Sequence, residues 1–388
     1  MATFKNISSI ASKPNWKATV CLGYGDNGKK QIARKQGFNT KKEAEKWAAD
    51  IVNKKNKGFI APTEGNTLFK EYINKWFDEY KSKHISINTR INYRSRIDTH
   101  IIPKLGSYKL NKITNAIIQD FYNDLIGEGM KPSSVKKIME TINGVFKYAQ
   151  KSKLIYSLPT DIERQPMNKA KVEYWVQEEI DFYLNEIKDK YLYTPILIEI
   201  FTGLRVGELC GLRWCDIDLD NKYLIVNNQV IYDRELKILV FSEILKTDTS
   251  HRKITLPQIL IDHLKSIKGD AAETDFVVLS REGTMCNPRN LSMNFTKSIQ
   301  KYKKSIDDLK KENKIIPKNY MQLKQISFHA LRHTHATLLI FNGENIKVIS
   351  ERLGHKNIST TLDTYTHVME DMKNNTADLL DSIFRYQQ

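Results

Sequence analysis

The 388-residue sequence has few cysteines and lacks several patterns that would direct the interpretation elsewhere. Its four cysteines, Cys21, Cys210, Cys215 and Cys286, form no Cys-x-x-Cys pair, so neither a disulfide framework nor a zinc site is expected. No apolar run approaches the roughly 18 residues that a membrane span needs. The first residues, 1–17, lack the apolar segment of a secretory signal. Together these absences predict a cytoplasmic protein.

Positive charge is abundant, and it is unevenly placed along the chain. The net charge is +16, of which residues 1–65 carry +8, residues 66–168 carry +7 and residues 169–388 carry only +1. This asymmetry predicts that the first part of the chain contacts a polyanion over a wide surface. Nucleic acid is favoured over an anionic membrane, because the basic residues are spread over folded-looking segments and not gathered on one amphipathic helix.

Length and composition predict a folded protein of several domains. The chain exceeds the usual size of one domain, and its hydrophobic fraction of 40% can supply more than one core. Linkers are predicted at Gly58–Asn66 and Leu158–Ala170, where prolines interrupt the periodic segments. We therefore expect a multidomain α+β protein with domains at residues 1–60, 66–160 and 170–388.

The first predicted domain is a small β-sheet backed by one helix. Residues 16–22 and 29–35 alternate as strands around the turn signal at 25–28, which indicates a hairpin. Thr40, with Glu43 three residues later, has the pattern of a helix N-terminus, and the helix extends to about Asn53. The strand residues predicted to enter a DNA groove are Lys29, Lys30, Arg34 and Lys35. A solvated strand face is the alternative.

The second predicted domain is entirely helical. Helical periodicity begins at Leu68 and continues through residues 88–100, 114–125 and 133–150. Basic side chains near helix starts or on exposed faces are predicted to meet DNA phosphates, although charged helix faces are often only solvated. The candidates are Arg90, Arg94, Arg96, Lys136 and Lys137.

The third predicted domain mixes helices with short strands and is mainly helical. Helices are expected at 176–187 and 195–201, followed by four strands and further helices to the end. The four strand-like stretches are 223–226, 229–232, 253–256 and 276–279. Residues 297–324 are interpreted as a lysine-rich insertion, forming a solvated helix and loop.

Five short motifs of this third domain are specific as a set. In chain order they are Thr202-Gly203-Leu204-Arg205-Val206-Gly207-Glu208-Leu209, Leu245-Lys246-Thr247, His329-Ala330-Leu331-Arg332-His333, Leu353-Gly354-His355 and Tyr365. In this order and spacing they resemble the tyrosine recombinase (phage integrase) family. The resemblance covers the whole C-terminal domain, whereas any one of the motifs alone occurs by chance.

The two arginine motifs suit phosphodiester chemistry. Two guanidiniums can hold the nonbridging oxygens of a phosphate bidentately as charge develops on phosphorus, and they need no metal to do so. Arg205 and Arg332 fit that description, although either alone is more simply a salt-bridged surface residue. Glu208 lies one turn from Arg205 and is a candidate ion-pair partner. The resemblance implies that Glu208 orients the arginine or a neighbouring histidine.

The remaining motif residues supply a nucleophile and proton transfers. A phenol is a weak nucleophile near neutral pH and needs a base, so Tyr365 is predicted to attack with His329 as its base. His355 can donate a hydrogen bond to the phosphate. The resemblance implies that Lys246 is the general acid for the leaving 5′ oxygen, with Lys237 and Lys253 as competitors on the same stretch.

The other histidines are given simpler interpretations. His329 and His333 are four residues apart on a predicted helix, which is a metal-ligand spacing, but the glutamate of the zinc-protease pattern is missing. No metal and no other cofactor is therefore predicted. His333, His335 and His367 are interpreted as packing or surface groups.

The resemblance also implies an architecture and partners. The first two domains are similar to arm-binding and core-binding domains, and the third to the catalytic domain of integrases. A homotetramer on two DNA attachment sites, a Holliday junction and a 3′-phosphotyrosyl intermediate are implied, with an excisionase and a host DNA-bending protein as further partners. The extra N-terminal domain favours an integrase of a phage or mobile genetic element. A recombinase for inversion or dimer resolution is the main alternative; a type IB topoisomerase and a transcription factor that has lost catalysis are less favoured.

Overall fold

The computed structural model describes residues 2–7, 15–24, 30–56, 67–155, 157–166, 172–243, 251–312 and 320–372. The chain divides into two compact units, Met1–Asn168 and Lys169–Gln388. The boundary between them lies within the segment that the sequence predicts as the second linker, while the predicted first linker falls wholly outside the described residues. Within the described ranges, every helix is too short or too polar to cross a membrane.

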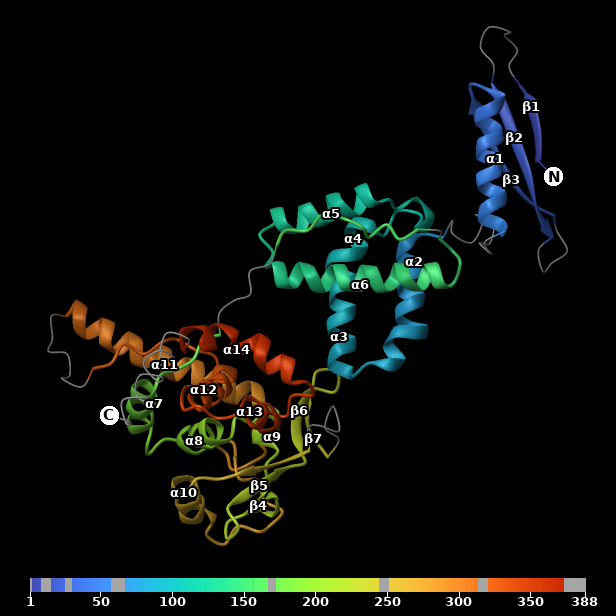
Figure 1. Ribbon diagram of the computed structural model, residues 1–388. Helices are drawn as coiled ribbons and strands as arrows, with labels where there is room; N and C mark the ends of the chain where they lie inside the picture. The colour runs from blue at the N-terminus through green and yellow to red at the C-terminus, as the bar shows by residue number, and fades with distance from the viewer. Residues whose placement is uncertain are drawn as a thin grey trace, which may run out of the picture. The chain divides into compact units, whose positions relative to one another are not determined.

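The first unit begins with a three-stranded antiparallel sheet and a helix packed against it (Figure 1). Its strands are β1 (Ala2–Asn6), β2 (Trp16–Tyr24) and β3 (Lys30–Phe38), in the order β1-β2-β3, and helix α1 covers Lys41–Asn56. Val20, Ala33 and Ala48 are buried between sheet and helix. The predicted hairpin and helix are confirmed, and β1 is an additional strand.

The start of α1 shows how its sequence specifies the helix. Thr40 Oγ1 accepts a hydrogen bond from the backbone N–H of Glu43 at 3.2 Å. Glu43 in turn accepts one from the backbone N–H of Asn39 at 3.0 Å. Because the first N–H groups of a helix have no partner within the helix, these two contacts stabilise its start. The predicted capping pattern is confirmed, except that the Glu43 carboxylate accepts from the N–H of Asn39 and not from that of Thr40.

The rest of the first unit is helical, as predicted. Its α-helices are α2 (Phe69–Lys75), α3 (Ile87–Arg96), α4 (Ile102–Leu105), α5 (Asn115–Gly127) and α6 (Pro132–Lys151). Short π or 3-10 turns lie between them, η2 (Trp76–Lys81), η3 (Ser82–His84), η4 (Ile97–Ile101) and η5 (Leu110–Lys112). One apolar face of α6 packs in the core, where Phe146 stacks on Phe69 with ring centroids 5.3 Å apart.

The second unit surrounds one large hydrophobic core. Its helices are α7 (Gln177–Glu186), α8 (Tyr193–Thr202), α9 (Val206–Cys210), η6 (Trp214–Asp216), α10 (Gln258–Lys268), α11 (Pro288–Lys311), α12 (Phe328–Phe341), α13 (Ile346–Leu353) and α14 (Ile358–Met372). Its strands are β4 (Ile217–Asp218), β5 (Tyr223–Val226), β6 (Gln229–Asp233), β7 (Ile238–Ser242) and β8 (Arg252–Thr255). They form an antiparallel sheet β4-β5-β8 and a hairpin β6-β7.

Two expectations for this unit differ from the structure. Residues 276–279 make only the isolated bridges Arg213↔Phe276 and Leu279↔Met285, so Val277 and Val278 are buried without forming a strand. The segment expected as a solvated helix and loop, 297–324, is helical up to Lys311 in its described part, but that helix is not wholly solvated. Helix α11 starts upstream of it and buries Phe295, Ile299 and Ile306 along one face, because these residues recur at helical spacing.

Helix α12 is fixed from several sides, which matters because it carries two of the motif residues. It packs against α8, α11, α13 and α14. The fully buried Trp175 donates from its indole N–H to the backbone oxygen of Lys324 at 3.0 Å, and its backbone N–H donates to Thr334 Oγ1 at 3.0 Å. These bonds tie the segment before α7 to the helix and to the chain leading into it.

Candidate active site

The first motif arginine, Arg205, stands at the start of helix α9. Helix α8 ends at Gly203, whose positive φ of 62° lets the chain turn sharply before Arg205. Glu208 then holds this arginine twice. Its Oε2 accepts from the backbone N–H of Arg205 at 2.9 Å, and its Oε1 accepts from Arg205 Nη1 at 2.6 Å.

The second motif arginine, Arg332, is buried on α12 with 3% exposure. Its Nη1 donates to the backbone oxygen of Gly203 at 2.6 Å, and its Nη2 donates to that of Leu353. Arg205 Nη2 donates to the next carbonyl, that of Gly354, at 3.0 Å. The structure therefore brings both guanidiniums to the end of α13. Burial, with Arg205 and then Arg252 adding repulsion, lowers the pKa of Arg332 to about 10.

A third arginine, Arg252, completes this cluster and was missed in the sequence. It lies at the start of β8 with its side chain 6% exposed. Its Nη2 pairs with Glu208 Oε2 at 2.7 Å, and its Nε donates to the backbone oxygen of Arg352 at 2.7 Å. Its guanidinium also lies 3.1 Å from where a Cβ on Gly354 would stand. Arg252 thus connects two parts of the site. It contacts the Glu208 carboxylate, which also binds Arg205, and it contacts the chain that leads into His355.

Glu208 is the buried anion among these arginines. Burial raises the pKa of its carboxyl, but Arg252 and then Arg205 outweigh burial, so the pKa is held below its usual value. The carboxylate is consequently charged near neutral pH and pairs with both guanidiniums.

Two motif histidines lie within electrostatic reach of the same arginines. Burial, followed by repulsion from Arg332 and Arg205, lowers the pKa of His329. The same causes in the same order lower the pKa of His355 to about 4. His355 Nδ1 is 2.8 Å from Thr361 Oγ1, which fixes the orientation of the ring. Both imidazoles are therefore neutral near pH 7.

Tyr365 lies on α14 with only 1% of its surface exposed. Burial raises the pKa of its phenol, an effect that Arg332 partly opposes. Its hydroxyl is 2.8 Å from His333 Nδ1, and the two rings meet edge to face with centroids 5.7 Å apart. His333 was interpreted as a packing or surface group. The only hint to its position was its spacing of one helical turn from His329.

The predicted general acid, Lys246, lies outside the described residues, between β7 and β8 in the sequence. Its two competitors are described. Lys253 Nζ stands 3.4 Å from the centre of the Tyr223 ring on the neighbouring strand. Lys237 occupies the β6–β7 turn with a positive φ of 57°. The side chain of His367 is also outside the description.

The predicted DNA contacts of the first sheet do not share one face. Arg34 pairs with Thr19, and Lys35 pairs with Ala18, which is buried on the α1 side. Because neighbouring strand residues point to opposite faces, only Arg34 of these two lies on the face away from the helix. Lys29 and the side chain of Lys30 fall outside the described residues.

Among the predicted contacts of the helical region, two arginines are engaged within the unit itself. Arg94 donates to Asn74 Oδ1 at 2.9 Å and pairs with Asp98 at 3.3 Å. Arg96 donates to the backbone oxygen of Lys137 at 2.8 Å. The side chains of Lys136 and Lys137 are exposed near the start of α6, while Arg90 is half-buried on α3.

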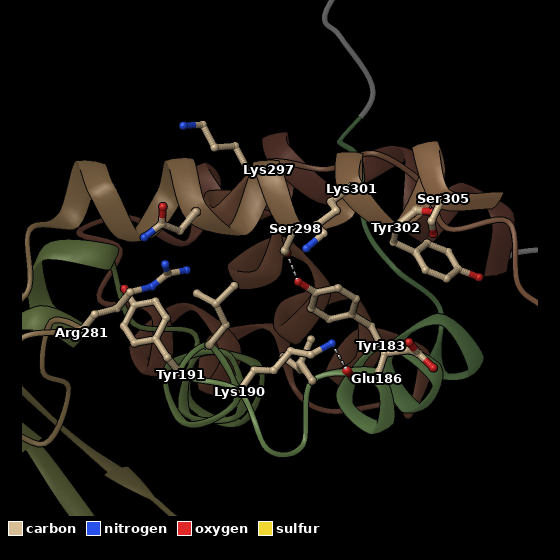
Figure 2. Close-up of a pocket in the computed structure, with 13 residues that line it drawn as sticks. Tyr183, Glu186, Lys190, Tyr191, Arg281, Lys297, Ser298, Lys301, Tyr302 and Ser305 are labelled. Carbon is tan, nitrogen blue, oxygen red and sulfur yellow. Dashed lines mark hydrogen bonds between the residues drawn. The ribbon is translucent and has the colours of Figure 1, made fainter. Parts of the chain in front are cut away.

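A separate cavity of about 790 Å³ lies between α11 and the chain around the end of α7 (Figure 2). Arg281, Lys190 and Lys301 line it, together with three tyrosines. Lys190 Nζ donates to the backbone oxygen of Glu186 at 2.6 Å, and the hydroxyl of Tyr183 contacts that of Ser298. None of the lining residues is a predicted site residue, so this cavity is distinct from the arginine cluster.

Comparison with protein families covers all three predicted domains. Residues 176–372 match the phage integrase family. The chain belongs to this family. Residues 68–126 match the N-terminal SAM-like domain of phage integrases, and residues 7–55 match an arm DNA-binding domain. The protein is accordingly a tyrosine recombinase, an enzyme that cleaves and rejoins DNA.

Curated relatives resemble this integrase along most of its length. A "Tyrosine recombinase XerC-like" protein of Caldanaerobacter subterraneus subsp. tengcongensis is 30% identical, covering 96% of this chain and 97% of the relative. The "ICEBs1 integrase" of Bacillus subtilis is 29% identical over 75% of this chain and 77% of its own.

Solved structures show the same fold. The Tn1549 transposon integrase in complex with transposon right end DNA has a TM-score of 0.66 at 20% identity, covering 79% of this chain and 99% of that one. A lambda integrase dimer bound to a COC′ core site has a TM-score of 0.57 at 20% identity, covering 77% of this chain and 95% of that one.

Proposed function

We propose that this integrase inserts a phage or mobile genetic element into host DNA by site-specific recombination, with Tyr365 as the nucleophile. The observation that carries the proposal is the arrangement around Arg332. Arg205, His329, His355 and Tyr365 all lie within electrostatic reach of this one buried guanidinium.

In the proposed reaction the two arginines bind the scissile phosphate. Arg205 and Arg332 neutralise the nonbridging oxygens, and His355 donates a hydrogen bond to the same group as the pentavalent state forms. Tyr365 attacks phosphorus, and the 5′ oxygen departs with a proton from Lys246. The product is a 3′-phosphotyrosyl linkage that conserves the energy of the broken bond. A 5′ hydroxyl of the partner strand then reverses the step, so neither ATP nor a metal is needed.

The domain roles are part of the same proposal. Residues 1–60 would bind separate arm sites, and residues 66–160 together with 170–388 would clamp the core site. Exchange of strands between two sites calls for four subunits and a Holliday junction, and excision would add an excisionase and a host DNA-bending protein. The arm DNA-binding match at residues 7–55 supports an integrase over a recombinase of inversion or dimer resolution.

The experiment begins with the DNA beside the coding sequence. An element boundary flanked by short direct repeats supplies a pair of attachment sites, which are placed on two plasmids with the purified protein. Joining of the plasmids at the repeats is expected. Recombination that proceeds only between sites on one molecule, and never between two, would favour inversion or resolution.

A further inference from the structure

His333 directly contacts the nucleophilic oxygen of Tyr365. Its Nδ1 is 2.8 Å from the phenol oxygen. The phenol has one hydrogen to donate, and a neutral imidazole has one nitrogen able to accept it. Burial raises the pKa of Tyr365 and lowers that of His333 to about 4, so both groups are neutral, and in the tautomer with its hydrogen on Nε2 the imidazole accepts the phenol hydrogen at Nδ1.

His329, the base expected from the sequence, lies one helical turn before His333 on α12. Its ring packs edge-on against the ring of His333, with centroids 5.0 Å apart. In the described part of the chain, the hydrogen-bond partner at the Tyr365 hydroxyl is His333. A proton leaving the phenol therefore has a direct acceptor that is not His329.

We propose that His333, and not His329, receives the phenol proton when Tyr365 attacks DNA. The inference rests on the proposed function and deepens it. As the bond from the phenol oxygen to phosphorus forms, the O–H bond breaks and its hydrogen moves to Nδ1 of His333. The bond from phosphorus to the 5′ oxygen breaks, and that oxygen takes a proton from the general acid. In the rejoining step the departing phenolate recovers its proton from His333.

The groups around His333 make it a weak base in the absence of DNA. After burial, His329 and Arg332 are the causes that lower the pKa of His333, and His355 lies close enough to interact with it. A bound phosphodiester would bring negative charge to Arg332 and offset that repulsion, making His333 a stronger base. The proton transfer is thus coupled to the arrival of DNA.

The test uses the full chain and a nicked half-site whose scissile 5′ oxygen is replaced by sulfur. A thiolate leaves without a general acid, so this substrate isolates defects at the nucleophile from defects at the leaving group. Three variants are compared with wild type: His333→Asn, His333→Ala and His329→Asn, which removes the rival base. Asparagine can still accept a hydrogen bond from the phenol but cannot take its proton.

Both His333 variants should form the covalent adduct about 100-fold more slowly or worse on the sulfur substrate, with DNA binding and melting temperature retained. Their rates should rise with pH as the phenol ionises on its own, while the wild-type rate stays nearly flat, and the loss in His333→Asn should exceed the loss in His329→Asn. Wild-type rate and pH profile in His333→Asn would overturn the inference, as would a loss confined to His329→Asn. If wild type itself forms no adduct, the failure lies in the proposed function instead.

Discussion

Arg252 is expected to be essential to the cluster although no catalytic motif includes it. Arg252→Ala removes a 2.7 Å ion pair to the buried Glu208 and a 2.7 Å bond to the backbone oxygen of Arg352. Breaking a buried pair from one side leaves an uncompensated charge and costs about 3–5 kcal/mol. Two charge-assisted bonds of about 1.5–3 kcal/mol each give a similar figure. Because Arg205 still pairs with Glu208, the lower end is expected.

The assay is urea unfolding of the full chain, with adduct formation on a half-site measured in parallel. A loss of about 3 kcal/mol is a large part of the roughly 5–15 kcal/mol that stabilises a typical domain. Arg281→Ala is the matched control, since this exposed arginine contacts only the face of Tyr191 among the interactions described, and a change under about 1 kcal/mol is expected.

A double-mutant cycle measures the interaction energy of the Arg252–Glu208 pair apart from the other contacts of the two residues. Glu208→Gln combined with Arg252→Met should be less destabilising than the sum of the single changes, because both charges of the buried pair are removed together and only the part-exposed Arg205 loses its partner. A loss below about 1 kcal/mol for Arg252→Ala, with full adduct formation, would refute the assigned position of this arginine.

Three further predictions concern acid stability, metal dependence and DNA contacts. Burial and then Arg352 lower the pKa of His335 to about 3, so the unfolded chain gains a proton below about pH 6.5 that the folded chain does not. The contribution of His335 to stability should fall by up to about 1.4 kcal/mol per pH unit on acidification, and His335→Asn should show a shallower slope in urea unfolding at about pH 7 and pH 5. Cleavage should continue in excess EDTA; loss restored by magnesium and not by a polyamine would instead indicate metal-assisted transfer. Deleting residues 1–60 should spare core-site cleavage, remove the protection of arm sites in footprints and weaken the salt dependence of DNA binding. Footprints that are identical with and without residues 1–60 would exclude an arm-binding role.

Local signals in the sequence predicted much of the fold. The turn at 25–28 and the pair Thr40 and Glu43 predicted the hairpin and α1, because turns and helix starts depend on neighbouring residues. Strand β1 depends on its partner instead, through pairs such as Phe4↔Ala18, and its five residues carry no comparable signal. Residues 276–279 show the converse error, since Val277 and Val278 are buried in a segment that forms only isolated bridges.

The candidate site was likewise predictable where local motifs define it and not where contacts between distant residues do. Motif order and spacing singled out Arg205 and Arg332, and the structure brings them together at the end of α13. Arg252 and His333 could not be identified in this way. Their importance arises from contacts across 44 and 32 positions of sequence, to Glu208 and Tyr365. Such contacts exist only after the strands and helices have packed.

The central claim is that Tyr365 forms the covalent bond to DNA, and one measurement tests it directly. Wild type and Tyr365→Phe are incubated with a nicked half-site, denatured in SDS and examined for DNA-linked protein. The phenylalanine variant loses only the hydroxyl, so it should bind DNA like wild type and form no adduct, while peptide mapping of the wild-type adduct should place the DNA on Tyr365. An SDS-resistant adduct that persists in Tyr365→Phe would contradict the account.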